Sequence, residues 1–172
     1  MLSLVSGERI AADAVISNVD VRRTLRDLVG SGPALRAERR IARRYEPACS
    51  GVVLYLGLDR QYDHLAHHNF VFSGDSRAEF ADIYEHGRPA RDPTLYICAP
   101  SRTDPSQAPA GAEALYILVH TPYIRPGSIQ GDTDALLAAY RPVVMQKLAR
   151  FGMGDIESRI VVERALTPRG ID

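Results

Sequence analysis

Apolar positions in the middle of the chain follow the pattern of β-strands. Residues 49–58 form a run that is apolar on both faces, which is typical of a strand covered on both sides. Residues 67–73, 94–99 and 113–121 predict three further strands, and residues 156–166 predict a closing one. The sequence therefore predicts a sheet built from segments that lie far apart along the chain.

Helical patterns separate these strands. Asn18 or Asp20 is expected to cap a helix that reaches residue 28, and Pro33 is expected to open a second helix that reaches about residue 45. A third helix is predicted from residue 76 to about residue 86, with Phe80, Ile83 and Tyr84 on one side. A fourth is predicted over residues 133–151, with the apolar stripe Leu136, Leu137, Tyr140, Val144 and Leu148.

The first 17 residues predict a β-hairpin that turns at Ser6, Gly7 and Glu8. Strands that return through long loops and single helices predict an α+β fold: a mostly antiparallel, mixed β-sheet with helices packed on one face. A chain of 172 residues with 45% apolar and 24% charged residues has the size and composition of one soluble domain, with two small ones also within range. Because the chain opens almost inside a strand and stops soon after another, we expect a piece of a longer chain.

Each of three central strands carries tyrosine on one face and aliphatic residues on the other, since successive residues of a strand point to opposite faces. The tyrosines are Tyr55, Tyr96 and Tyr116. If these faces align, the aliphatic side packs on helices and the tyrosine side lines a tunnel for a long apolar ligand, because tyrosine combines apolar area with a polar tip. The alternative is a sheet face that packs on other parts of a longer chain.

Several kinds of site are not expected. The sequence has no G-x-S-x-G, G-x-G-x-x-G or G-x-x-x-x-G-K-[ST] motif, so neither a hydrolase nucleophile nor a nucleotide-phosphate loop is predicted. Formal net charge is zero, which argues against a nucleic-acid partner. His64, His67 and His68 form H-x-x-H-H, but a strand would point His67 and His68 to opposite faces, so we expect no metal site.

Arginines are concentrated between residues 22 and 44, where the second helix has a basic face opposite an apolar one. Such a helix either lies on anionic lipid or presents a solvated face to water. No apolar run approaches the ~20 residues that span a bilayer, and residues 1–15 do not read as a secretory signal. Cys49 and Cys98 are expected to be buried thiols of a reducing compartment. We therefore expect a cytoplasmic protein, with a peripheral position at the inner face of the membrane, through the Arg-rich helices, as the alternative to a solvated helix face.

Five segments, in order, resemble the middle of the bacterial-type phytoene desaturases, a family of FAD-dependent carotenoid desaturases. They are residues 8–29, 46–73, 76–87, 93–123 and 149–172. The most specific stretches are His67-His68-Asn69 and residues 99–106. The resemblance implies that residues 1–172 are one substrate-binding domain fragment, without the nucleotide-binding βαβ unit and the closing flavin segment of the family.

The resemblance further implies FAD as the cofactor of the parent protein, none bound by this fragment alone, and a carotenoid or isoprenoid substrate such as phytoene. Asn18 matches a position near the flavin domain, and no catalytic residue or metal ligand is carried over. From the face analysis, the substrate-binding candidates are Tyr55, His67, Phe70, Tyr96 and Tyr116. Two alternatives stay open: a stand-alone isoprenoid or lipid carrier, and a related flavoprotein that acts on retinoids or apocarotenoids. A surface uncovered by excision would also favour dimerisation.

Overall fold

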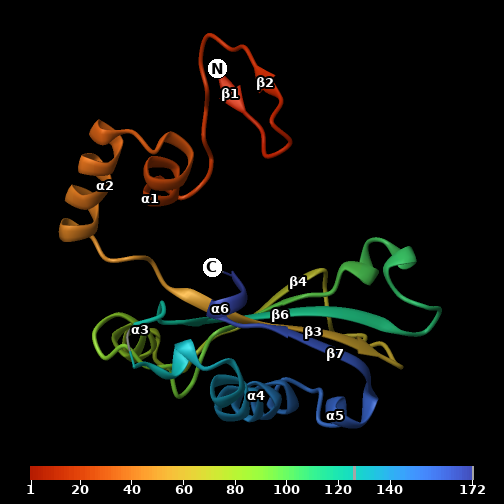
Figure 1. Cartoon of the computed structure of the whole chain (residues 1–172). Coiled ribbons are helices and arrows are strands. Elements are labelled where there is room, and N and C mark those ends of the chain that lie inside the picture. The colour runs from red at the N-terminus through yellow and green to blue at the C-terminus, as the bar shows by residue number, and fades with distance from the viewer. Residues whose placement is uncertain (126, 172) are drawn as a thin grey trace. The chain divides into compact units, whose positions relative to one another are not determined.

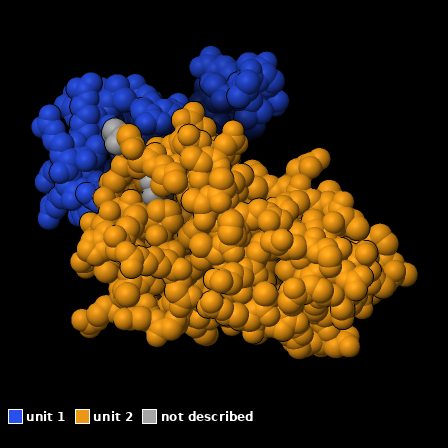
Figure 2. Space-filling view, turned by 90° about the horizontal axis from the view of Figure 1, so that it is seen from below, with its two compact units in different colours: residues 1–47 blue, residues 48–172 orange. Residues whose placement is uncertain are grey.

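The chain divides into two compact units, residues 1–47 and residues 48–172 (Figure 2). The structure is a computed structural model that describes residues 1–125 and 127–171. Pro126 and Asp172 lie outside the described residues. The first unit contributes a hairpin and two helical segments, and the second contributes the main sheet and the helices that pack on it (Figure 1).

The first unit opens with the predicted hairpin, in which β1 (Leu2–Ser3) pairs antiparallel with β2 (Arg9–Ile10). Gly7 lies in the turn at a φ of 88°, in the left-handed region that glycine adopts without strain. The expected continuation of the second strand to about residue 16 is wrong. Residues 11–19 are not part of a strand, and no described segment pairs with them, so their backbone groups have no ladder to join.

Two helical segments complete this unit and confirm the predicted starts. The Asp20 carboxylate accepts hydrogen bonds from the amides of Arg22 and Arg23, at 2.9 and 3.1 Å, and so caps α1 (Val21–Arg23). The chain continues as a π-helical segment, Thr24–Val29. Ser31 caps α2 (Gly32–Arg44), whose buried Glu38 accepts a 2.8 Å hydrogen bond from Arg22 Nε. This ion pair ties the two helical segments together.

The second unit is built on a sheet of five strands among the described residues. They are β3 (Ser50–Leu58), β4 (His68–Val71), β5 (Leu95–Cys98), β6 (Glu113–Thr121) and β7 (Ile160–Leu166). Their order is β4-β5-β6-β3-β7, and every neighbouring pair is antiparallel. We call this the main sheet. The predicted α+β fold is confirmed, and the strand predictions are correct to within a few residues except at the start of β7.

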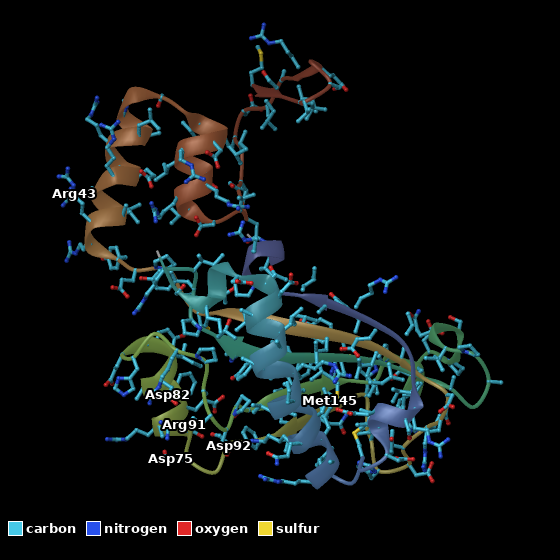
Figure 3. The ribbon with its side chains drawn as sticks, turned by 60° about the horizontal axis from the view of Figure 1, so that its bottom comes forward. Arg43, Asp75, Asp82, Arg91, Asp92 and Met145 are labelled. Carbon is cyan, nitrogen blue, oxygen red and sulfur yellow. The ribbon has the colours of Figure 1, made fainter. Side chains whose placement is uncertain are left out.

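Helices cover one face of the main sheet. The helices α4 (Thr133–Arg150) and α5 (Ile156–Arg159) run below the sheet in Figure 1, whereas α3 (Ser76–Tyr84) lies beside one end of it and the short α6 (Pro168–Ile171) lies above it. The predicted α4 stripe is buried apart from Leu137, which is partly buried, and Met145 of the same helix extends toward the sheet (Figure 3). These side chains meet the aliphatic face of the sheet, where Leu54, Ile97 and Ile117 are at most 1% exposed. Burial of this layer is the main source of the unit's stability.

Two helix expectations need correction. Residues 156–159 form α5, so the closing strand begins at Ile160 and not at residue 156. Of the three residues expected on one side of α3, only Ile83 is buried. Phe80 and Tyr84 are 50% and 47% exposed and stack on each other with ring centroids 6.0 Å apart. The helical spacing was correct, but these two rings pack along the helix surface instead of on the core.

Asp155 holds the start of α5 to the loop after β3 and makes stability depend on pH. Tyr62 Oη donates to its carboxylate at 2.8 Å, with Arg159 Nε at 3.0 Å and Arg60 Nη1 at 2.8 Å. The Tyr62 hydroxyl, followed by the two arginines, holds the pKa of Asp155 well below its usual range. A depressed folded-state pKa contributes stability that is present above the unfolded value of about 3.9 and is lost as pH falls below it.

Asp155→Asn is therefore expected to flatten the acid limb of the stability curve. Between pH 5 and pH 2, urea midpoints of the wild type should fall more steeply than those of the variant, because the variant has no carboxylate to protonate. Parallel curves over this range would contradict the assignment. Asp134→Asn provides the control: no hydrogen bond or ion pair links that carboxylate to another described residue, so its curve should follow the wild type.

Candidate ligand-binding face

The face of the main sheet opposite α4 and α5 carries its aromatic side chains in register. In the row that crosses the sheet at Tyr55, the cross-strand partners are Arg164, Tyr55, Tyr116, Cys98 and His68, from β7 to β4. With strands about 4.8 Å apart, this row spans about 19 Å. The neighbouring row holds Leu166, Val53, Leu118, Tyr96 and Phe70. Side chains from five strands thus form one continuous surface.

Aromatic rings contact one another along these two rows. Ring centroids lie 5.5 Å apart for Tyr55 and Tyr116, 6.0 Å for Tyr116 and Tyr96, and 5.1 Å for Tyr96 and Phe70. These spacings are those of favourable edge-to-face and tilted aromatic pairs. We call this surface the tyrosine face and define it as Tyr55, His68, Phe70, Tyr96, Cys98 and Tyr116.

The tyrosine face is open to solvent, although it is rich in apolar area. Tyr55 is 41% exposed and Phe70 is 55% exposed, whereas the aliphatic residues on the other side of the same strands are buried. The predicted division of the sheet into an aliphatic face on helices and a separate tyrosine face is therefore correct. An exposed apolar patch of this kind, made by aligned side chains, marks a surface that contacts a ligand or another protein segment.

A groove of about 810 Å³ borders the tyrosine face beside Tyr55 and Tyr116. Gly57 and Ala114, which are direct cross-strand partners, form its floor. Val162 lines it on the β7 side, and the loop of residues 107–112 lines it on the other. A Cβ atom on Gly57 would come within 2.6 Å of Val162 Cγ1, so the Val162 side chain occupies the space beside Gly57 that a larger side chain would need. The lining is mostly apolar, as in sites for hydrophobic ligands.

The hydroxyl groups of Tyr96 and Tyr116 stay neutral. Burial, with smaller contributions from the neighbouring Cys98 and Tyr116, raises the pKa of Tyr96. Burial, followed by the neighbouring Tyr55 and Cys98, raises the pKa of Tyr116. Both phenols are therefore uncharged hydrogen-bonding groups at neutral pH. Such a surface accepts apolar material without the cost of desolvating a charge.

His67 and His68 lie on the same side of the sheet, contrary to the expectation that they point to opposite faces. Strand β4 begins at His68, so the alternation of a strand does not apply to His67, and the two ring centroids are 4.3 Å apart. His68 is the residue that shares a face with Phe70. His64 lies elsewhere, with its ring 5.2 Å from that of Phe151. The three histidines of the motif thus do not converge.

His67, His68 and Cys98 each offer one atom that could bind a metal ion, and these three atoms lie within 4.8 Å of one another. Ligand atoms around a tetrahedral zinc are roughly 3.3 to 3.8 Å apart, given bonds of about 2.0 to 2.3 Å. Hydroxyl groups reach both rings instead: Tyr96 Oη lies 2.9 Å from His68 Nδ1, and Thr103 Oγ1 lies 2.5 Å from His67 Nδ1. We call these five residues the histidine cluster. Its geometry is that of a hydrogen-bonding group at the β4 edge of the tyrosine face.

The structure brings together Tyr55, Phe70, Tyr96 and Tyr116 as the sequence predicted, with His67 beside them. Sequence reasoning missed His68, Cys98 and Thr103. The spacing of His68, Phe70 and Phe72 at every second residue could have identified His68, but Cys98 and Thr103 join the cluster only through the pairing of β4 with β5 and the turn that follows β5. The role of all these residues in binding substrate remains a prediction.

Asn18, expected near a flavin, is exposed in the segment between β2 and α1. The nearby start of α1 does not fit a pyrophosphate, because the Asp20 carboxylate already accepts its free amides and would repel an anion. No described glycine-rich loop leads from a strand into a helix as dinucleotide sites require. The described residues therefore do not by themselves form a complete FAD site.

A second hollow, of about 610 Å³, lies along α3 and the loop after it. Asp75, Asp82, Arg91 and Asp92 gather there (Figure 3). Asp82 pairs with Arg88 at 2.7 Å, and Asp92 pairs with Lys147 at 2.6 Å. This hollow is polar and charged, so the groove at the tyrosine face is the better site for an apolar ligand.

In the described parts of the chain, no helix is both long and apolar enough to cross a membrane. No protein-family model matches the chain. It is similar to a 4,4'-diapolycopene oxygenase of Methylomonas sp, with 42% identity over 170 residues that cover 99% of this chain and 33% of that protein. It is also similar to 4,4'-diaponeurosporene oxygenases, at 37% identity over 169 residues in Staphylococcus haemolyticus and 35% over 171 residues in Staphylococcus aureus. The chain spans about a third of the length of these curated relatives.

Proposed function

The chain is a homologue of carotenoid oxidoreductases over nearly its whole length, and we propose that its tyrosine face binds the polyene of a carotenoid substrate in an FAD-dependent enzyme. The observation that carries the proposal is the open aromatic face that borders an apolar groove. The substrate class is an acyclic polyene of the kind that the relatives' names give, such as 4,4'-diapolycopene or 4,4'-diaponeurosporene.

We propose that the polyene lies across the strands, along the row from Tyr55 to His68. A conjugated chain is long, flat and stiff, so it can contact the rings of Tyr55 and Tyr116 together. The small side chain of Ala114 leaves room for its methyl branches at the groove floor. Each 100 Å² of apolar surface removed from water contributes about 2.5 kcal/mol. This is sufficient to hold a ligand that has few polar groups.

The flavin of the proposed enzyme would be held by residues outside these 172, since the described residues do not form its site and the relatives are about three times as long. When bound, FAD supplies two-electron oxidation chemistry. This chain's own share is to align the polyene and exclude water. Arg36, Arg39, Arg40 and Arg43 of α2 form a basic face suited to anionic lipid. We propose that they meet the membrane in which such a polyene dissolves.

Tyr55→Arg tests the tyrosine face. A guanidinium at this position must be desolvated when the polyene covers it, so affinity for 4,4'-diapolycopene should fall about tenfold or more. The measurement is quenching of tyrosine fluorescence in detergent solution, which suits a chain with eight tyrosines and no tryptophan. The unfolding free energy should change little, because Tyr55 is exposed on the open face.

Tyr84→Arg is the matched control, because Tyr84 is 47% exposed against 41% for Tyr55 and lies on α3, outside the tyrosine face. Its polyene affinity should equal that of the wild type. Equal affinities for all three proteins would rule out the tyrosine face as the polyene site. An equal loss in both variants would mean that added charge alone, wherever placed, weakens partition of the polyene onto the chain.

A further inference from the structure

We propose that the histidine cluster binds the oxygen-bearing end of a polyene, so that the chain prefers a substrate or product with a terminal hydroxyl or carbonyl group over the parent hydrocarbon. This inference rests on the proposed function, because it assigns one end of the same ligand. It adds a polar subsite to a surface that otherwise offers mainly apolar contact.

The hydrogen bonds of the cluster leave a nitrogen of each imidazole available. Tyr96 Oη and Thr103 Oγ1 each lie at an Nδ1 atom, whereas neither Nε2 atom has a protein partner among the described residues. A hydroxyl that donates to Nδ1 selects the tautomer in which Nε2 carries the hydrogen. In that tautomer His68 Nε2–H is a donor, and a carbonyl or hydroxyl oxygen is the acceptor that it requires.

The position of the cluster suits the end of a long ligand. His68 is separated from Tyr55 by three strand spacings, or about 14 Å. A polyene that lies in the groove beside Tyr55 and crosses Tyr116 and Cys98 reaches His68 at the edge strand β4. Phe70 and Tyr96 contribute apolar rings on one side of this edge. A hydrogen bond beside these rings is less exposed to competing water than one on an open polar surface.

The expected preference is set by one net hydrogen bond, which corresponds to about a fivefold to tenfold difference in affinity. The probes are 4,4'-diapolycopene and the same polyene with terminal aldehyde groups. Their dissociation constants are measured with the 172-residue chain by fluorescence quenching in one detergent. The ratio of the two constants is then compared between the wild type and each variant, because the different partition of the two polyenes into micelles cancels in that comparison.

His68→Phe keeps a ring that can stack on Tyr96 but removes the Nε2–H donor. The preference for the aldehyde-bearing polyene over the hydrocarbon should therefore fall about fivefold. The control is His120→Phe, since His120 is also exposed, on β6, and takes no part in the cluster. A ratio that is unchanged in His68→Phe, or that changes equally in both variants, would overturn the polar subsite while leaving polyene binding intact. If the wild type binds neither polyene, the proposed function itself fails.

Discussion

Replacement of Glu113 by alanine is expected to lower the free energy of unfolding by about 3 to 5 kcal/mol, the range for removing one partner of a buried ion pair. Glu113 is 1% exposed. Its carboxylate accepts hydrogen bonds from Arg102 Nε at 2.6 Å, Arg102 Nη2 at 3.2 Å and the backbone amide of Tyr62 at 3.0 Å. The variant leaves a largely buried guanidinium and a buried amide without their acceptor.

The loss would be large because Arg102 also donates to the Tyr62 carbonyl, at 2.5 Å, so three segments meet at one carboxylate. These are the start of β6, the turn after β5 and the loop after β3. Glu113→Gln keeps an acceptor for the Tyr62 amide and should lose less stability than Glu113→Ala. Glu157→Ala is the surface control, since the Glu157 side chain is 62% exposed and lies 3.4 Å from Arg141. A loss below about 1 kcal/mol for Glu113→Ala in urea titrations would contradict this account.

Ala114→Phe is expected to reduce polyene affinity at least about tenfold, the equivalent of about 1.4 kcal/mol, because the added ring fills the floor of the groove. Ala114 faces the open side of the sheet, directly opposite Gly57. The phenylalanine therefore occupies ligand space and not the helix-covered core. The unfolding free energy should change by less than about 0.5 kcal/mol. Fluorescence quenching and urea denaturation of the same preparation measure the two effects.

Leu118→Phe is the control for this substitution. Leu118 lies on the same strand and the same face but does not line the groove. It should retain wild-type affinity within about twofold, which is less than 0.5 kcal/mol. If both phenylalanine variants bind as the wild type does, the groove is not part of the polyene site. If Leu118→Phe alone weakens binding, the polyene follows the row at Tyr96 and not the row at Tyr55.

The two-faced character of the main sheet could be predicted from the sequence because side-chain direction in a strand depends only on parity. Parity alone separated Tyr55, Tyr96 and Tyr116 from the aliphatic residues of their own strands, but it is the strand register that places all three tyrosines on one face of the sheet. The position of His67 was less predictable, because parity applies only within the strand, and β4 begins one residue later, at His68. Within the strand, however, parity already placed His68 and not His67 on the face of Phe70, so the choice of His67 did not follow from the spacing.

The rest of the site depends on contacts that local pattern does not encode. The groove requires Gly57 opposite Ala114, a pairing that follows from the register of β3 with β6, and a loop of residues 107–112 that returns to the sheet edge. Phe80 and Tyr84 had the spacing of a buried stripe yet are exposed, since helical period gives the side of a helix but not what covers it. The expectation that Asn18 lies near a flavin rested on the resemblance alone.

The most direct test of the tyrosine face uses the two cysteines of the chain, which are both free and half-buried. Cys98 lies in the row between Tyr116 and His68, whereas Cys49 precedes β3 and is not part of the tyrosine face. The measurement is the rate of alkylation of each thiol, followed by mass spectrometry, with and without saturating 4,4'-diapolycopene. We predict that the polyene slows Cys98 several-fold and leaves Cys49 unchanged. An unchanged rate at Cys98, with the polyene bound, would contradict the account.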